Sequence, residues 1–302
     1  GTTLFGAASV SADVDPKRLS DIVRILASDE FEGRSPGTQG ETKTVNYLIE
    51  TFRDLGLEPG GERGGWTQDV PLLRTQVEMP RTLQVSVKGK AHPLIQAKDI
   101  YLSTIRNSQS ATIEDAPVVF VGYGVTAPER QWDDFKGIDV RGKVIVCLVN
   151  DPDFSAQPGE AVSGKFGDRR MTYYGRWTYK FEEAAKRGAV AALIVHDTDG
   201  AGYGWSTVTA PAGENYALLH ADPTEAPPTL QLQGWLEGEA AAELFRSAGF
   251  HLAVLRFICR PALILTYHPE VYGRENLIKN GSFIVVSNHV DTFDPIMVSH
   301  AV

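Results

Sequence analysis

The chain has 302 residues, of which 42% are hydrophobic and 22% charged, and its formal net charge at pH 7 is −9. This length is sufficient for two domains with substantial cores, and the composition is that of an ordinary globular protein. The acidic balance argues against a general nucleic-acid-binding protein, because such proteins normally present a basic patch. No apolar run in the sequence approaches the roughly 18 residues needed to span a bilayer.

The first residues have features of a targeting segment. Residues 4–9 are apolar or small, and residues 10–12 read Val-Ser-Ala, which is typical of the tail of a secretory signal and its cleavage site. An unstructured start is the alternative, and the sequence leaves both open.

Two helices are predicted in the first sixty residues. Asp15-Pro16 precedes regularly spaced apolar residues and predicts a capped amphipathic helix. The turn-forming residues 33–40 predict a loop, and the apolar spacing of 38–55 predicts a second helix that Gly56 ends.

The region after residue 60 alternates strand and helix signals. Residues 66–71 and 82–87 alternate apolar and polar side chains, as half-buried strands do. Further on, apolar runs predict buried strands and an amphipathic pattern predicts a helix ended by Gly188. The three strands are 118–121, 144–149 and 189–195, and the helix is 173–187. This alternation predicts a compact α/β or β-rich unit.

Three features of this region could suggest a site, and a structural role is favoured for each. Cys147 has no C-x-x-C partner and is expected to be a small buried side chain. His196 to Gly200 follows a strand, and a strand-ending turn is favoured over a metal-binding loop. Helix packing is favoured over a peptide cleft for the aromatic residues Tyr173, Tyr174, Trp177 and Tyr179.

Several separated phrases resemble the bacterial dizinc aminopeptidases that carry an inserted protease-associated (PA) domain. The opening phrase is Leu-Ala-Ser-Asp-Glu-Phe-Glu-Gly-Arg-Ser-Pro-Gly-Thr at 26–38, followed by Leu-Gly-Leu-Glu-Pro at 55–59. The phrases that resemble the insert are 119–124, 132–135, 139–149, 181–196 and 201–205. The resemblance covers about residues 13–250. It implies a secreted or periplasmic enzyme that hydrolyses N-terminal peptide bonds with two zinc ions, and an insert that acts as a lid or substrate-access module.

The last fifty residues offer two kinds of site. His289 and Asp291 form an H-x-D pair that resembles the first zinc ligand and supporting acid of the aminopeptidases. That family also uses a bridging Asp, a Glu-Glu pair, a further acid and a final His, whereas no Glu follows Glu275. Because a dizinc hydrolase needs a fixed ligand set and a base, we expect no tightly bound zinc and no aminopeptidase activity in this chain.

The context of His289 better resembles the beginning of a lysophosphatidic-acid (glycerolipid) acyltransferase. The matching phrases are 271–277 and 281–289, followed by Asp294-Pro295. This resemblance implies that His289 is the general base and that Asp294 orients it. It also implies that the apolar-basic segment 252–265 contacts a membrane surface, with a core helix as the alternative. Independently of the family, Asp294-Pro295 is a helix start signal, so we expect a strand at about 283–287 and a helix after Asp294.

The expected fold class is α/β. We expect an incomplete aminopeptidase-like portion at 13–111, a β-rich PA-like domain at 112–250 and a short α/β acyltransferase-like fragment at 251–302. A fusion, a truncation and an assembly artefact all remain open for this composite pattern. The expected partner is a peptide substrate and not nucleic acid. The function alternatives are a secreted zinc aminopeptidase, a glycerolipid acyltransferase fragment and a non-catalytic PA-type interaction module.

Overall fold

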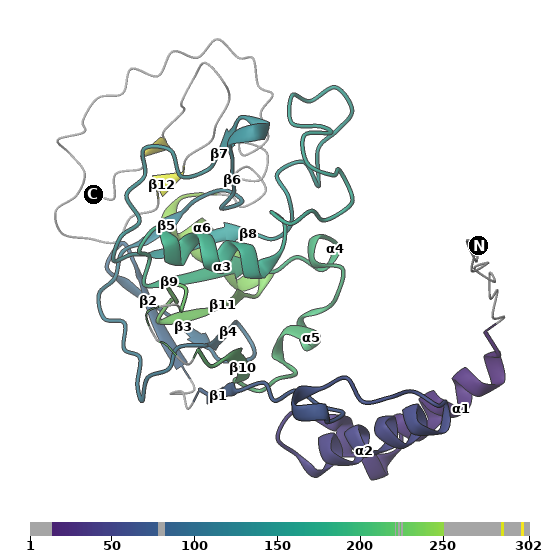
Figure 1. Ribbon diagram of the computed structural model, residues 1–302. Coiled ribbons are helices and arrows are strands. Elements are labelled where there is room, and N and C mark those ends of the chain that lie inside the picture. The colour runs from purple at the N-terminus through teal and green to yellow at the C-terminus, as the bar shows by residue number, and fades with distance from the viewer. Residues whose placement is uncertain are drawn as a thin grey trace. The chain divides into compact units, whose positions relative to one another are not determined.

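The chain forms two compact units, Gly1–Val70 and Pro71–Val302, each of which is described by itself. The computed structural model describes residues 14–77, 82–220, 222, 224 and 226–250, and the backbone of 285–286 and 297–298 (Figure 1). Across these ranges no helix has the length and apolar character to cross a membrane.

The first unit is helical. It contains α1 (Pro16–Leu26), the 3-10 turn η1 (Asp29–Arg34), α2 (Gln39–Asp54) and the 3-10 turn η2 (Glu62–Gly64). The Asp15 side chain accepts a hydrogen bond from the Lys17 N–H at 2.9 Å and so caps α1. Thr38 caps α2, and Gly56 follows it with φ +74°, a conformation that favours glycine. Both predicted helices are confirmed.

The second unit is built on a five-stranded sheet with the strand order β4-β11-β9-β8-β5. The neighbours β11 and β9, β9 and β8, and β8 and β5 are parallel, whereas β4 is antiparallel to β11. The strands are β4 (Ile100–Ser103), β5 (Val118–Phe120), β8 (Val144–Leu148), β9 (Ala191–Val195) and β11 (Leu232–Leu236). The architecture is therefore mixed α/β, as the sequence predicts. We call residues 71–250 the sheet unit.

Short ladders and helices complete the sheet unit. The ladders pair β1 (Leu72–Gln76) with β10 (Glu214–Leu218), β2 (Thr82–Val87) with β3 (Lys90–Ile95), and β6 (Thr126–Ala127) with β7 (Trp132–Asp133). The helical elements are η3 (Pro128–Arg130), α3 (Trp177–Lys186), α4 (Thr198–Ala201), α5 (Trp205–Thr209) and α6 (Gly238–Ala248).

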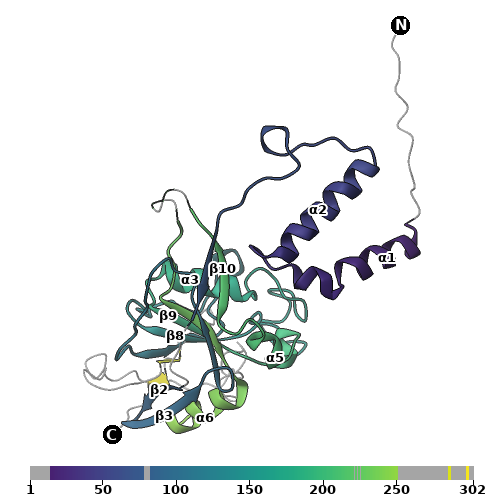
Figure 2. The ribbon, with the colours of Figure 1, turned by 90° about the horizontal axis from the view of Figure 1, so that it is seen from below.

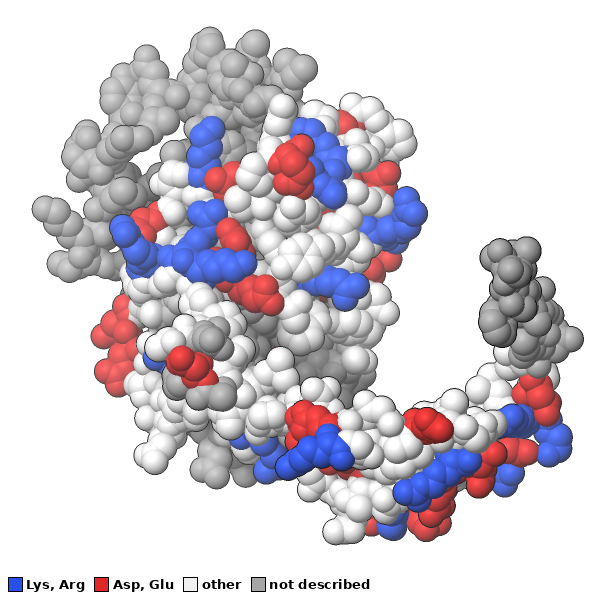
Figure 3. Space-filling model, viewed as in Figure 1, with Lys and Arg blue, Asp and Glu red and all other residues white. Residues whose placement is uncertain are grey.

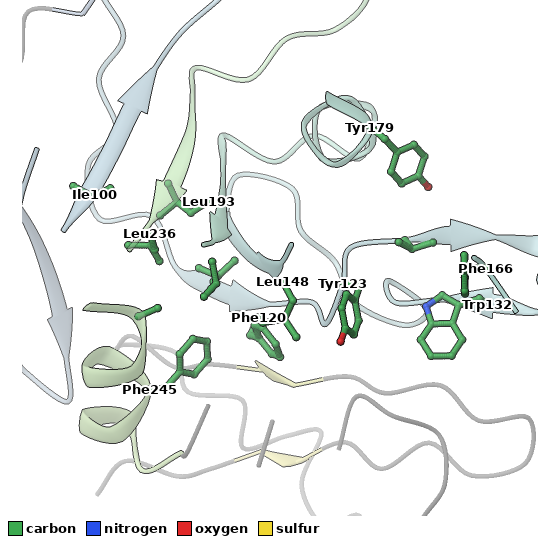
Figure 4. Close-up of a cluster of buried hydrophobic side chains, with 14 of the residues drawn as sticks. Ile100, Phe120, Tyr123, Trp132, Leu148, Phe166, Tyr179, Leu193, Leu236 and Phe245 are labelled. Carbon is green, nitrogen blue, oxygen red and sulfur yellow. The ribbon is translucent and has the colours of Figure 1, made fainter. Parts of the chain in front are cut away.

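Alternate residues of the sheet supply two hydrophobic layers. Val146 and Leu148 of β8 lie in the same core cluster as Phe245 of α6, and the rings of Phe120 and Phe245 are 5.2 Å apart between centroids (Figure 4). Cys147 lies in the other cluster, with the α3 residue Phe181. This two-residue period places α6 and α3 on opposite faces of the sheet (Figure 2). Cys147 is 0% exposed, which confirms its predicted burial.

Two predicted elements differ in the structure. Residues 66–71 are not a strand, because Trp66 stacks against Phe52 of α2 with ring centroids 6.4 Å apart; the strand begins at Leu72. The predicted helix 173–187 begins only at Trp177. Thr172, the residue before the predicted helix, donates its N–H to Asp151. Turns therefore occupy residues 173–176. In both cases a tertiary contact outweighs the local pattern.

The C-terminal prediction is partly corrected. The strand β12 (Val285–Val286) lies within the predicted strand 283–287, but it pairs antiparallel with β13 (Met297–Val298). A helix starting at Asp294-Pro295 and running through residue 298 is therefore wrong. Pairing with the β-branched residues of β12 outweighs the local helix start signal.

Strands from before residue 112 belong to the sheet unit. Strand β4, from residues 100–103, forms one edge of the sheet, and β1 pairs with β10. The compact unit begins at Pro71, and the predicted division into 13–111, 112–250 and 251–302 stays a prediction.

Candidate functional site

The catalytic and metal-binding residues predicted from sequence lie outside the described residues. These are His289, Asp291 and Asp294, and the same holds for the segment 252–265. Their roles stay predictions. Where side chains are described, no three His, Cys, Asp or Glu residues are grouped so that they could hold a metal ion.

A buried lysine joins the carboxyl ends of two parallel strands. Lys180 of α3 is 0% exposed, and its Nζ donates hydrogen bonds to the Tyr123 carbonyl at 2.5 Å and the Asn150 carbonyl at 3.0 Å. Tyr123 follows β5 and Asn150 follows β8, so the ammonium group fixes the two strand ends together. Burial lowers the pKa of Lys180, while the nearby carboxyls of Asp151 and Asp134 act in the opposite direction.

Two buried carboxylates anchor the loop 150–176 that leads from β8 to α3. Asp151 accepts hydrogen bonds from the Thr172 N–H at 2.6 Å and the Thr172 hydroxyl at 2.9 Å. Asp153 accepts from the backbone N–H groups of Phe166, Gly167 and Asp168 at 2.7, 3.1 and 3.1 Å. Burial raises the pKa of Asp151, and the bonds from Thr172 oppose that shift. These oxygens therefore act as structural acceptors that fix the loop.

A third buried carboxyl has its pKa near neutrality. Asp134 is 1% exposed, and its carboxylate accepts a hydrogen bond from the Val125 N–H at 3.0 Å. Burial raises its pKa to about 7, and the bond from Val125 reduces the shift. At this burial Asp134 meets no solute, so it affects stability rather than chemistry on a ligand.

The segment 196–200 has a local structural role. The Asp197 side chain accepts from the Gly200 N–H at 3.0 Å and caps α4. His196 Nε2 lies 3.0 Å from the Tyr203 carbonyl oxygen, which can only accept, so Nε2 carries the proton. The imidazole lies among the rings of Tyr203, Trp205 and Trp235. The turn interpretation is therefore the one that the structure supports.

The aromatic residues near α3 divide into a packed pair, with Tyr179 buried and Tyr174 partly buried, and an exposed pair. Tyr179 is 4% exposed, and its hydroxyl bonds to the N–H and carbonyl of Thr126 at 3.0 and 3.1 Å. The Tyr174 hydroxyl donates to Glu129 at 2.7 Å. By contrast, Tyr173 is 56% exposed and Trp177 is 43% exposed. Packing thus explains the first pair and leaves the rings of the second pair accessible.

Each exposed ring packs beside a buried aromatic ring of α3. The Tyr173 ring lies 5.1 Å from that of Tyr179, and the Trp177 ring lies 6.0 Å from that of Phe181, between centroids. A Cβ added at Gly175 would lie 2.8 Å from Met171 Cγ, so the Met171 side chain lies against Gly175. Met171 is 39% exposed. We call Met171, Tyr173 and Trp177 the aromatic surface.

Sequence reasoning missed the residues that fix this surface. Asn150, Asp151 and Asp153 follow the apolar run of β8 directly, and polar residues just after a buried strand were the available signal. Lys180 lies one residue before Phe181 and four before Ala184, on the buried stripe of its helix. A lysine at that helical position was the signal for a buried, partnered ammonium group.

The chain was compared with protein family models, curated proteins and solved structures. No protein family model and no curated protein matches the chain. Among solved structures, an aminopeptidase from Aneurinibacillus sp. strain AM-1 is similar, with 17% sequence identity and a TM-score of 0.29. The alignment covers 77% of this chain and 41% of that protein, so the chain spans less than half of its length. At this identity and TM-score the likeness implies nothing about activity.

Proposed function

We propose that the chain is a portion of a secreted zinc-dependent aminopeptidase, and that its sheet unit is a non-catalytic PA-type module that contacts polypeptide. The observation that carries the proposal is the aromatic surface, where Tyr173 and Trp177 stay exposed on a loop anchored by the buried Asp151. The family assignment rests on the sequence phrases at 26–38 and 55–59 and on the phrases of the insert.

The polar groups of the sheet unit favour a binding role over catalysis. Asp151 and Asp153 satisfy loop N–H groups, and Lys180 satisfies two strand-end carbonyls. Because these groups are buried and already partnered, their effect is to hold the loop in one conformation. A surface that is ordered before binding loses less conformational entropy on complex formation.

The chemistry of the aromatic surface suits an extended polypeptide. Tyr and Trp offer large apolar faces with few rotatable bonds, and they are enriched in the residues that dominate protein interfaces. Met171 beside them offers an adaptable thioether contact. An apolar or aromatic side chain of a peptide would gain contacts with groups of this kind.

The helical unit supports the enzyme part of the proposal. In α1, Leu19 is 53% exposed and Val23 is 56% exposed, and no residue of this helix is buried. An amphipathic helix with an uncovered apolar face is expected where the helix belongs to a larger domain. The phrase at 26–38 is followed by α2, and the resemblance includes a helix after this phrase.

Peptide binding by the full chain tests the proposal. A panel of fluorescein-labelled twelve-residue peptides that differ in aromatic content would be titrated by fluorescence anisotropy. We expect binding of the aromatic peptides, weakened at least about tenfold in the double variant Tyr173→Ser/Trp177→Ser. The control Leu218→Ser removes another exposed apolar side chain, 63% exposed in β10. Absence of binding, or equal binding by the double variant, contradicts the proposal.

A further inference from the structure

Two arginines without partners border the aromatic surface. Arg170 and Arg176 are exposed, and neither side chain has a hydrogen bond, ion pair or ring contact within the described part of the chain. The neighbouring Arg169 differs, because it donates to Asp199 at 2.8 Å and its Cζ lies 4.7 Å from the centre of the Phe154 ring. Residues 165–177 hold four basic side chains and one acidic, Asp168, within a chain whose net charge is −9.

The turns of the loop bring these arginines close to the aromatic surface. The Arg176 N–H donates to the Tyr173 carbonyl at 3.3 Å, and Arg176 immediately precedes Trp177. Arg170 immediately precedes Met171, whose side chain lies against Gly175. On the face that carries α3, basic side chains lie among acidic side chains and uncharged surface (Figure 3). Arg170 and Arg176 therefore each adjoin a residue of the aromatic surface in the chain.

Resting on the function proposed above, we propose that this surface selects acidic peptide segments, in which Asp or Glu side chains flank an apolar or aromatic residue. The apolar residue contacts Tyr173, Trp177 and Met171. The flanking carboxylates pair with Arg170 and Arg176, whose planar guanidinium groups match carboxylate geometry. The positive charge also attracts such segments from a distance at low ionic strength.

Three capped peptides test this charge selection on the full chain: Gly-Asp-Glu-Phe-Glu-Asp-Gly, the same peptide with Asn and Gln in place of Asp and Glu, and a version with Lys at those four positions. We expect the acidic peptide to bind about five- to tenfold more tightly than the neutral one at low salt, and the lysine peptide to bind most weakly. The preference should decrease as salt approaches 0.5 M, because salt screens exposed charges.

The double variant Arg170→Gln/Arg176→Gln tests whether these two arginines cause the preference for the acidic peptide. It should bind the acidic and neutral peptides equally, while the control Arg141→Gln, at an exposed arginine paired with Asp139, should retain the difference. Equal affinity of the unmodified chain for the acidic and neutral peptides overturns the charge selection and leaves the proposed function standing. Absence of binding by any peptide overturns both. If sedimentation instead shows a dimer that Tyr173→Ser/Trp177→Ser dissociates, the surface is a contact between copies and the selection is overturned.

Discussion

Asp151 holds Thr172 through two hydrogen bonds, from the backbone N–H at 2.6 Å and from the side-chain hydroxyl at 2.9 Å. Asp151 is 0% exposed at the carboxyl end of β8, whereas Met171 and Tyr173 on either side of Thr172 are exposed. One buried carboxylate thus connects the core of the sheet with the aromatic surface.

Replacing this carboxylate should loosen the loop. We expect Asp151→Ala to destabilise the sheet unit by about 1–3 kcal/mol, since the Thr172 N–H and hydroxyl lose their buried acceptor. Hydrogen exchange at the Thr172 amide should accelerate in parallel. Asp139→Ala, which removes an exposed aspartate, serves as the control. An unchanged exchange rate at Thr172 would show that the loop is held by other contacts.

Lys180 should be intolerant of an apolar replacement. Lys180→Met keeps much of the side-chain volume but leaves the Tyr123 and Asn150 carbonyls without their donor. We expect a loss of about 2–4 kcal/mol in the free energy of unfolding, measured by urea denaturation. Lys186→Met changes an exposed lysine of the same helix and should cost little. Equal stability of the two variants would refute the structural role of Lys180.

Asp134 should give the stability a specific pH dependence. Burial raises its pKa to about 7 in the folded chain, above the value near 4 expected in the unfolded chain. Between these pH values the folded state binds a proton that the unfolded state has released. The contribution of Asp134 is therefore fully present below about pH 4 and is lost as pH rises to about 7.

The variant Asp134→Asn isolates this contribution. The stability of the unmodified chain relative to the variant should fall by about 1.4 kcal/mol per pH unit over this interval and change little above it. Urea denaturation of both proteins from pH 4 to 8 provides the measurement. A difference that grows in the opposite direction, or none, would contradict the assigned pKa.

Cys147 should be unreactive in the folded chain. It is 0% exposed, and burial raises the pKa of its thiol to about 11, so the thiolate is scarce at neutral pH. Iodoacetamide should label the peptide containing Cys147 only after denaturation, whereas the exposed variant Ser108→Cys should be labelled in the native state. Rapid native labelling at Cys147 would indicate that this part of the sheet opens readily.

Elements that depend on neighbouring residues could be predicted from the sequence, whereas features that depend on distant contacts could not. The Asp15 cap and the alternation of residues 82–87 depend on neighbours in the chain, so α1 and β2 are found where they were predicted. The start of α3 depends on the bond between Asp151 and Thr172, twenty-one residues apart, which periodicity does not encode. The aromatic residues could be named from sequence, but their division into packed and exposed pairs required the contacts of Tyr179 with Thr126.

Photo-crosslinking tests most directly the claim that the aromatic surface contacts polypeptide. A twelve-residue aromatic peptide with one benzoylphenylalanine would be irradiated with the full chain and digested with trypsin. Cleavage after Arg170, Arg176 and Lys180 releases Met171–Arg176 and Trp177–Lys180 as separate fragments. We expect adducts on these two fragments, strongly reduced in Tyr173→Ser/Trp177→Ser. Adducts confined to α6 or to the β2–β3 ladder would contradict it.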